Sequence, residues 1–344
     1  MSAVEIPEAA PEFPDFAPAH ELQTNTGRRV AILAVVAGLV VLWPNVVSDR
    51  NLSSSIAILI LGLFAMSLDL LMGYGGLATL GHAMFFAFGG YSAGVIADRI
   101  TDQVFVTLPV AAIVGGITGF LIAKLALRTR MMQFMIITFA MSGLGIALID
   151  RLHEYTGGTD GLAAIPTAKM GGFAFDSPVK VFYLVAFLVA VSWFLMRRIV
   201  GSAFGRLVVG IRDNPVRISS LGVTPNSQLS ILFAIGGSFA AVAGALHVYW
   251  YKFISPESAG FAFSADGLFM VLVGGASNLY GGLIGAAVIH TGRDRLVEHT
   301  DNPNMYLGAL FVLFVLFVPG GIVGTSRRIK TNIKARMAAR SVES

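Results

Sequence analysis

The chain has 344 residues, of which 55% are hydrophobic and only 13% are charged, and its mean hydropathy is +0.75. Soluble globular domains carry roughly a quarter charged residues, so water is not the main solvent of this chain. The formal charge of +4 does not indicate nucleic-acid binding, because the basic residues fall between apolar runs. The absence of cysteine excludes a disulfide framework, a thiolate metal site and a cysteine nucleophile.

The first 27 residues combine four prolines with five acidic side chains. Because this composition offers too little apolar surface to fold, residues 1–27 are predicted to form a disordered tail. A secretory signal peptide begins with basic residues and continues into an apolar core, whereas this segment is acidic. The first crossing is therefore expected to act as an uncleaved membrane signal.

Nine nearly uncharged runs follow, each about the length that a bilayer-spanning helix requires. Only helices and closed barrels satisfy every backbone hydrogen bond in lipid, and no alternating pattern suggests a barrel. The prediction is an all-α, polytopic membrane domain over residues 28–325. The runs are Val30–Ser48, Ser53–Gly73, Gly81–Ala97, Val104–Leu127, Met131–Ile149, Val181–Met196, Leu229–Tyr251, Leu268–Ile289 and Met305–Gly324.

Basic residues indicate how these runs are oriented, because Lys and Arg are retained on the cytoplasmic side. They cluster before the first run, between the fourth and fifth, in residues 197–228 and in the tail 326–344. Both termini are accordingly expected in the cytoplasm of an inner-membrane protein. Residues 151–180 and 252–265 are nearly charge-balanced and are expected outside.

Nine full crossings would place the basic tail on the wrong side. The simplest solution is about eight full crossings plus a helical hairpin or re-entrant pair in Leu268–Ile289, which would bend at Gly274–Gly275 or Gly281–Gly282. Irregular backbone at that depth is tolerated only against protein or a water-filled cavity, so this region is a candidate pathway element. The alternative is one ordinary crossing whose glycines allow close helix packing, as Gly115/Gly119 and Gly281/Gly285 also suggest.

A glycine-rich joint connects the second and third runs and carries two ionisable residues near membrane depth. Asp69 and His82 are expensive there and therefore indicate a function. The alternative is that Asp69 reaches the cytoplasmic surface and His82 caps a helix. The pathway candidates are Asp69, Gly75, Gly76, Gly81, His82, Gly274, Gly275 and Gly281.

The basic segment 197–228 contains signals for a short helix outside the membrane. Asn214 can cap it, Pro215 suits its first position and Gly222 suits its end, so residues 215–221 are predicted to be helical. Such a helix favours a docking element over a basic loop that only binds anionic lipid, although both can hold.

The expected outer loop contains one glycine-rich stretch with a single carboxylate. It forms either a contact for a solute-delivering protein or simply a tight loop, and it lacks the spacing of a calcium loop. Its residues are Thr156, Gly157, Gly158, Thr159, Asp160 and Gly161.

Four groups of motifs, in order, resemble the LivM-like permease subunit of branched-chain amino acid ABC transporters. They lie in residues 73–91, in residues 156–162, in residues 205–223, and in the glycine pairs at 274–275, 281–282 and 320–321. The likeness extends from about Val30 to Gly324. The chain departs from the pattern at Asp69, where similar sequences carry an amide.

The resemblance implies a non-catalytic subunit that works with a homologous LivH-like permease, two cytoplasmic ATPases and a periplasmic or tethered binding protein. It also implies that the short helix is the coupling helix, which sits in a cleft of the ATPase. The coupling residues would be Arg206, Arg212, Asp213, Asn214, Pro215, Arg217, Leu221 and Gly222.

No phosphate loop, zinc-protease motif or nucleophile elbow occurs in the sequence, so any nucleotide would be hydrolysed by another chain, and no catalytic residue, metal or cofactor is expected. One alternative is an ion-coupled secondary transporter that uses Asp69 and His82. A passive channel would require rings of charge or carbonyl groups, which nothing suggests. Within the importer interpretation, the solute is a branched-chain amino acid or a related small polar molecule such as urea or a short amide.

Overall fold

The computed structural model of the protein describes residues 38, 42–129, 131–297, 305–306, 308–309 and 320–325. The chain divides into two compact units, Met1–Val46 and Val47–Ser344, and every helix named below belongs to the second unit. The two predicted tails and most of the first and last apolar runs lie outside the described residues.

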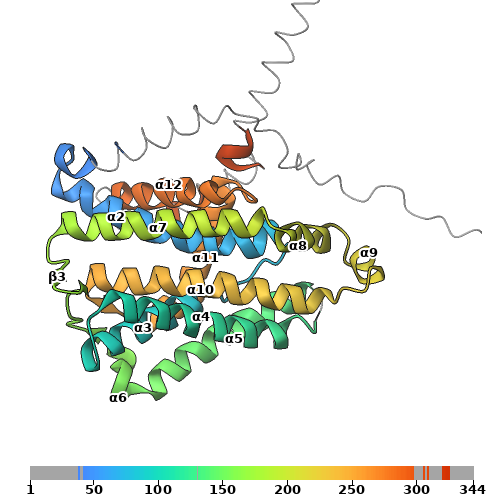
Figure 1. The fold of residues 1–344 in the computed structure, drawn as a ribbon, viewed down its shortest axis with the longest axis horizontal. Coiled ribbons are helices and arrows are strands. Elements are labelled where there is room, and N and C mark those ends of the chain that lie inside the picture. The colour runs from blue at the N-terminus through green and yellow to red at the C-terminus, as the bar shows by residue number, and fades with distance from the viewer. Residues whose placement is uncertain are drawn as a thin grey trace, which may run out of the picture. The chain divides into compact units, whose positions relative to one another are not determined.

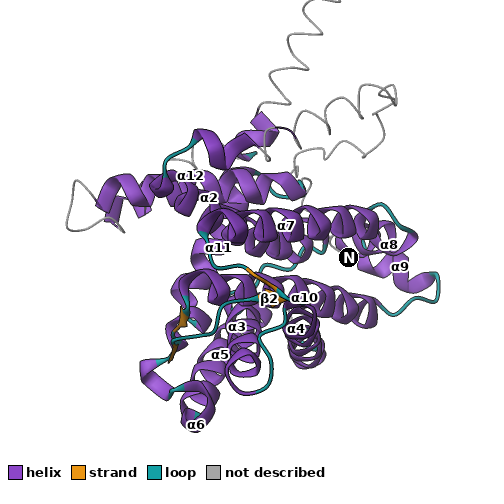
Figure 2. Cartoon of the chain, turned by 60° about the vertical axis from the view of Figure 1, so that its left-hand side comes forward, coloured by secondary structure: helices purple, strands orange, loops and turns teal. Residues whose placement is uncertain are grey.

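The described part of the second unit is built almost wholly from helices, with strands of only two residues (Figures 1 and 2). This confirms the all-α prediction. In chain order the elements are α2 (Asp49–Asp69), the π-helix η1 (Leu70–Tyr74), α3 (Ala83–Arg99), α4 (Val104–Ala126), α5 (Met131–Arg151), α6 (His153–Thr156), the 3-10 helix η2 (Gly158–Asp160), β1 (Leu162–Ala163), β2 (Lys169–Met170), β3 (Phe173–Ala174), α7 (Pro178–Val200), α8 (Ala203–Asp213), α9 (Pro215–Ser220), α10 (Pro225–Tyr251), β4 (Phe253–Ile254), the 3-10 helix η3 (Pro256–Ala259), α11 (Phe261–Gly274) and α12 (Leu279–Val297).

Among the described residues, five helices are long and apolar enough to cross a membrane. They are α2 with η1, α4, α5, α7 and α10, and each coincides with a predicted run. Helix α3 also matches its run, and its 17 residues span about 26 Å at 1.5 Å per residue, close to the lower limit for a crossing. The bent pair α11–α12 supplies a sixth candidate if it counts as one span.

The run predicted to bend is not one straight helix. Helix α11 begins at Phe261, earlier than predicted, and is followed after a short break by α12, whose direction differs from that of α11 by 112°. The break follows Gly274, at the first of the two predicted positions. Gly274 faces the backbone of Gly281, and Met270 faces Gly285. The two arms therefore run back along each other from the break and form a V.

Glycines bring several of the other helices together at backbone distance. Gly115 of α4 faces the backbone of Gly237 in α10, and Gly119 faces Phe233 one turn further along. These contacts confirm that the small-residue pairs at 115/119 and 281/285 serve helix packing. Helix α10 consequently packs closely along α4 and also lies against α3 (Figure 1).

Helix packing at the break is directly testable through one glycine. A Cβ at Gly274 would overlap the carbonyl of Gly281, which is backbone and cannot rotate away. Gly274→Val should therefore lower the free energy of unfolding by about 1–3 kcal/mol or more, as overpacking does. The thermal midpoint of the detergent-solubilised protein measures this change.

The matched control is Gly143→Ala in α5, because a Cβ at Gly143 meets no atom within 4 Å. This control should unfold at or slightly above the native midpoint, since alanine favours helix. Equal midpoints for the two variants would contradict the packing described at the break.

Candidate functional site

The last turn of α2 widens into the π-helix η1, which leaves backbone carbonyls to be satisfied by other segments. The carbonyl oxygen of Gly73 accepts two hydrogen bonds from distant parts of the chain. One comes from Arg212 Nη1 at 2.6 Å and the other from Ser277 Oγ at 2.8 Å. One backbone atom thus joins α2 to both α8 and the break between α11 and α12.

Asp69 lies one turn before Gly73 and is completely buried. Its Oδ1 accepts a hydrogen bond from the backbone N–H of Ser277 at 2.7 Å. Its Oδ2 is also buried and has no hydrogen-bond partner among the described residues. The alternative in which Asp69 reaches the cytoplasmic surface is therefore wrong, because the carboxylate is held inside by the broken helix pair.

Ser277 is the residue that sequence reasoning missed. Its backbone adopts φ +62°, a conformation that residues other than glycine rarely adopt, and its carbonyl accepts a hydrogen bond from Tyr74 Oη at 3.0 Å. Ser277 therefore uses its N–H, its carbonyl and its hydroxyl to hold the end of α2. The signal that could have found it is the polar pair Ser277–Asn278 within an apolar run.

Arg212 brings the predicted coupling segment into the same place. Its side chain extends from α8, is 19% exposed, pairs with Asp213 at 3.0 Å and lies 3.4 Å from Ser277 Oγ. Gly76, at φ +70°, leaves room for this side chain, since a Cβ there would overlap Arg212. We call the group Asp69, Gly73, Tyr74, Arg212 and Ser277 the Ser277 node.

The rest of the coupling segment forms two short helices outside the bundle. Ser202 caps α8 by accepting from the N–H of Gly205, and Asn214 caps α9 by accepting from the N–H of Arg217 at 2.9 Å. Helix α9 ends at Ser220, and Gly222, two residues further on, has φ +82°. The short helix is thus confirmed with its predicted cap and stop, whereas α8 was not predicted.

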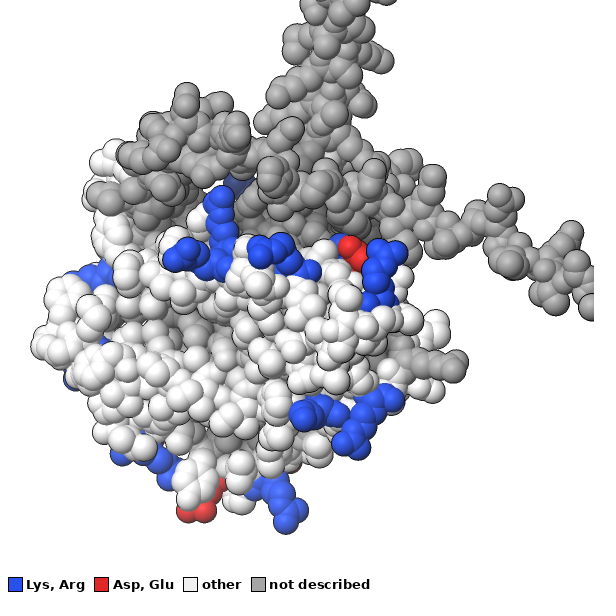
Figure 3. Space-filling view, turned by 45° about the vertical axis from the view of Figure 1, so that its right-hand side comes forward, with Lys and Arg blue, Asp and Glu red and all other residues white. Residues whose placement is uncertain are grey.

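Helix α9 has no buried residue, and apolar side chains flank its surface. Val216 is 75% exposed and Leu221 is 73% exposed, while Ile218 packs on Gly210 and holds α9 to α8. Figure 3 shows the side of the molecule that carries this end, where basic side chains dominate and acidic ones are sparse. Arg206 and Arg217 belong to the same two helices, and Arg206 Nη1 donates to the carbonyl of Gly201.

His82 occupies the N-cap position of α3, as the alternative expected, but its side chain makes no capping hydrogen bond. The buried imidazole forms a hydrogen bond between Nε2 and Ser67 Oγ at 2.8 Å, and its ring packs against Phe64 and Phe85. Gly81 beside it faces the backbone of Thr138 in α5. His82 therefore joins the start of α3 to α2 but takes no part in the Ser277 node.

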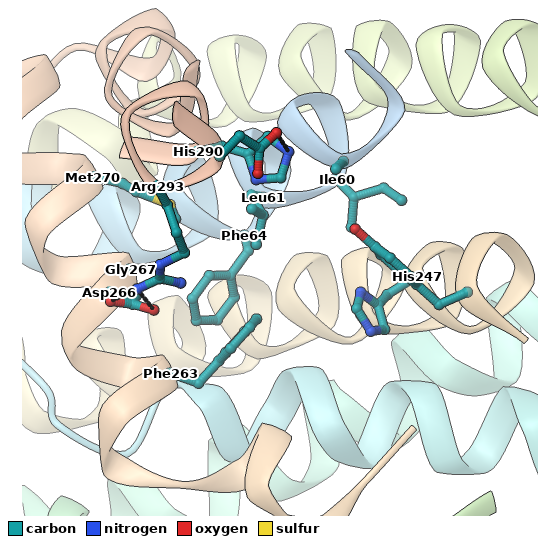
Figure 4. Close-up of a pocket in the computed structure, with 13 residues that line it drawn as sticks. Ile60, Leu61, Phe64, His247, Phe263, Asp266, Gly267, Met270, His290 and Arg293 are labelled. Atoms are coloured by element: carbon teal, nitrogen blue, oxygen red, sulfur yellow. Dashed lines mark hydrogen bonds and ion pairs between the residues drawn. The ribbon is translucent and has the colours of Figure 1, made fainter. Parts of the chain in front are cut away.

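A cavity of about 220 Å³ lies between α2, α10, α11 and α12. Figure 4 shows Asp266 and Arg293 on one side, the rings of Phe64 and Phe263 beside them, and His247 across the space. The guanidinium of Arg293 donates to both carboxylate oxygens of Asp266, at 2.9 and 3.0 Å. The other residues that line the cavity are Ala57, Ile60, Leu61, Tyr251, Gly267, Met270, His290 and Asp294.

The glycine-rich stretch predicted for the outer loop forms a tight, internally bonded turn. Gly157, Gly158 and Gly161 all have positive φ, and Thr156 Oγ1 donates to the carbonyl of Ile149 at 2.6 Å. Thr159 and Asp160 are exposed on η2. Strand β1 then pairs with β4, which fixes this stretch to the end of α10.

Two lysines hold the same end of the bundle. Lys252, just after α10, donates to the carbonyl of Pro166 at 3.2 Å, and burial lowers the pKa of its ammonium group. Lys180 pairs with Asp176 at 2.6 Å and lowers the pKa of that carboxyl. Among the described residues, no group of three His, Asp or Glu side chains could hold a metal ion.

The structure therefore gathers some of the predicted site residues and separates others. Asp69, Gly76 and Arg212 meet at the break that Gly274 and Gly275 begin, and Gly281 packs against those two glycines. Gly75 packs against Leu71 and Leu232. The stretch 156–161 contacts different elements, at the end of the bundle where α6 lies (Figure 1).

These features define a polytopic helical membrane protein with a broken helix pair tied to a short helical segment outside the bundle. The chain belongs to the family described as branched-chain amino acid transport system / permease component, whose family model matches residues 51–319. This match confirms the family resemblance that the sequence motifs indicated.

Individual relatives agree with the family. The chain is 28% identical to the high-affinity branched-chain amino acid transport system permease protein LivM of Escherichia coli (strain K12), over 88% of this chain and 77% of the relative. It is 24% identical to the corresponding LivH protein of Salmonella typhimurium, over 76% of this chain and 90% of the relative. The ribose import permease protein RbsC of Haemophilus influenzae is 24% identical over 58% of this chain and 62% of its own length. No solved structure matches the chain significantly.

The hydrogen bond from Ser277 to Asp69 predicts how substitutions at Asp69 affect stability. Asp69→Ala leaves the buried N–H of Ser277 unpaired and should destabilise the protein by about 1–3 kcal/mol. Asp69→Asn is the matched control, because its amide oxygen can take the place of Oδ1. In detergent, the native protein and Asp69→Asn should have similar thermal unfolding midpoints, and the midpoint of Asp69→Ala should be lower. An alanine variant as stable as the native protein would contradict this role.

Proposed function

We propose that the chain is the membrane-spanning permease subunit of an ABC importer, which moves branched-chain amino acids or a related small polar solute across the inner membrane. Separate subunits hydrolyse the ATP. Membership of the permease family and similarity to proteins named LivM and LivH support this proposal. The observation that carries it is that the exposed helix α9 is connected through α8 and Arg212 to the break in α11–α12.

Helix α9 has the properties of a docking element. Val216 and Leu221 are exposed at an end of the molecule where basic side chains dominate, so they are not explained by contact with lipid tails. The cap at Asn214 and the stop at Gly222 define and stabilise the two ends of the helix. We assign it the role of the coupling helix that an ATPase subunit binds.

Movement of α9 has a defined route into the bundle. Ile218 holds α9 to α8, and Arg212 of α8 is hydrogen-bonded to Gly73 at the end of α2. Ser277 shares that carbonyl and belongs to the break. A shift of α9 toward or away from the bundle would therefore change the angle between the arms of the V, and with it access to the space between α2, α11 and α12.

The proposal fixes the orientation and the partners. The α8–α9 end lies in the cytoplasm, as the basic residues require, and both termini lie on that side. The other subunits are a LivH-like permease, two ATPases and a periplasmic or tethered binding protein. The stretch 156–161, at the opposite end, is the proposed contact for the binding protein.

The alternative function is an ion-coupled secondary transporter that uses Asp69 and His82. Both residues are buried, as that function would require, but their contacts are structural: Asp69 bonds to Ser277 and His82 to Ser67. Uptake into proteoliposomes that contain the four proposed partners separates the two functions. The importer requires internal ATP and the binding protein, whereas uptake driven by an ion gradient alone would replace the importer with the secondary transporter.

The exposed apolar residues of α9 give a specific prediction. Val216→Asp and Leu221→Asp should each reduce co-purification of the ATPase subunit by about tenfold or more, since a charge replaces an apolar side chain that docking buries. Pull-down from detergent extracts measures the retained ATPase.

The matched control is Ile100→Asp, which changes a residue of similar exposure, 76%, that follows α3 at the opposite end. Its ATPase content should equal that of the native protein. Full ATPase retention by both α9 variants would exclude α9 as the docking helix.

A further inference from the structure

The cavity of about 220 Å³ has no role in the coupling route. We propose that it is a transient binding site for a zwitterionic solute with a short apolar side chain, in which Arg293 receives the carboxylate and Asp266, with Asp294, receives the ammonium group. Phe64 and Phe263 would contact the apolar part. This inference rests on the proposed importer function and adds the site and the charges by which the solute is recognised.

The size of the cavity favours a small solute. Pockets for drug-sized ligands measure about 300–1,000 Å³, so this space suits a molecule below that range. It corresponds to about seven water molecules at roughly 30 Å³ each. A solute with a handful of non-hydrogen atoms fits, whereas a peptide or a nucleotide does not.

The wall of the cavity carries one positive and two negative side chains. Arg293 and Asp266 pair with each other across the V, with 37% and 23% of their side chains exposed. The Nε of Arg293 is buried and has no hydrogen-bond partner among the described residues. Asp294 lies one position further along α12, where its Oδ2 accepts from Ser54 Oγ at 3.1 Å and lies 3.5 Å from His290 Nε2.

This arrangement matches a zwitterion better than a neutral solute. The carboxylate of the solute can pair with Arg293 in place of Asp266. The ammonium group of the solute can then pair with Asp266 in place of Arg293, so no charge is left unpaired. A neutral amide or urea would have to break the ion pair without replacing either charge. The ion pair therefore selects for solutes that carry both charges.

Aromatic rings lie beside the charged side chains in the cavity wall (Figure 4). Phe64 contacts Phe263 at 5.1 Å and Phe86 at 5.4 Å between ring centroids, and Phe86 contacts His247 at 5.3 Å. Such a surface suits aliphatic side chains but offers few hydrogen bonds to hydroxyl groups. Phe64 lies nine residues, or about 14 Å along the helix, before Gly73, so the cavity and the Ser277 node lie at different positions along α2.

The location also connects the site to the moving parts. Asp266 is on α11 and Arg293 is on α12, so the ion pair joins the two arms of the V beyond their break. A solute that separates the two side chains would weaken this link between the arms. Conversely, a change in the angle of the V would re-form the ion pair and displace the solute.

Photo-leucine, a diazirine analogue that keeps both charges and a short apolar side chain, provides a direct test. The assembled importer in proteoliposomes is illuminated with the probe, and labelled peptides are identified by mass spectrometry. Labelling should fall on α2, α11 and α12 around the cavity. Leucine and valine should compete, whereas leucinamide, 4-methylpentanoate and urea, which lack one or both charges, should not.

The double variant Asp266→Asn with Arg293→Gln removes both charges while keeping similar side-chain volumes. Its labelling should fall by about tenfold or more, since two charge-assisted hydrogen bonds are lost. Gel filtration and the thermal midpoint establish that it is folded. The control Asp102→Asn breaks the ion pair with Lys169, 2.7 Å apart and not part of the cavity, and should be labelled like the native protein.

Native labelling elsewhere, competition by leucinamide or urea equal to that by leucine, or full labelling of the double variant would each overturn the inference. Uptake by the unsubstituted importer is measured in the same vesicles. Loss of its ATP requirement would overturn the proposed function even if the cavity is labelled. ATP-driven uptake without cavity labelling would overturn only the present inference.

Discussion

A helix that breaks at membrane depth exposes backbone groups that lipid cannot satisfy, and the architecture of this protein follows from how that requirement is met. The break between α11 and α12 places Ser277 at φ +62°, with its N–H, carbonyl and hydroxyl all directed to the end of α2. Asp69 supplies a buried acceptor and the π-helix η1 supplies the Gly73 carbonyl. The π-helix and the buried carboxylate are thus explained together, because each satisfies part of the same broken helix.

The hydrogen bonds that satisfy the broken helix also reach a segment outside the bundle. The Gly73 carbonyl has a second donor, Arg212, which belongs to the segment that carries the exposed helix α9. The contacts that satisfy these backbone groups therefore also link α9, the proposed docking helix, to the break between α11 and α12. The cavity between α2, α10, α11 and α12 lies at a different position along α2, and its ion pair connects the same two arms. Coupling and solute binding would thus act on one V-shaped pair from its two ends.

The positions of the helices and of their ends could largely be predicted from the sequence, because they depend on neighbouring residues. Hydropathy located the helices, the distribution of basic residues favoured a bend in the run 268–289, and the Asn214, Pro215 and Gly222 signals located α9. The contacts that join these parts depend on tertiary packing. Neither the φ of Ser277 nor the approach of Arg212 to Gly73 is encoded by neighbouring residues, and the partner of Asp69 lies 208 positions away. The Asp266–Arg293 pair was missed because each residue lies at the edge of an apolar run and resembles an ordinary flanking charge.

The most direct test of the central claim is the number of solute molecules transported per ATP hydrolysed by importer that carries Ser277→Gly. Glycine keeps the positive φ and the N–H that Asp69 accepts, so only the hydroxyl bridge to Gly73 and Arg212 is removed. If the Ser277 node transmits motion from α9 to the V, ATP hydrolysis persists while uptake per ATP falls severalfold. If uptake per ATP equals that of the native importer, the node holds the fold together without coupling it to ATP.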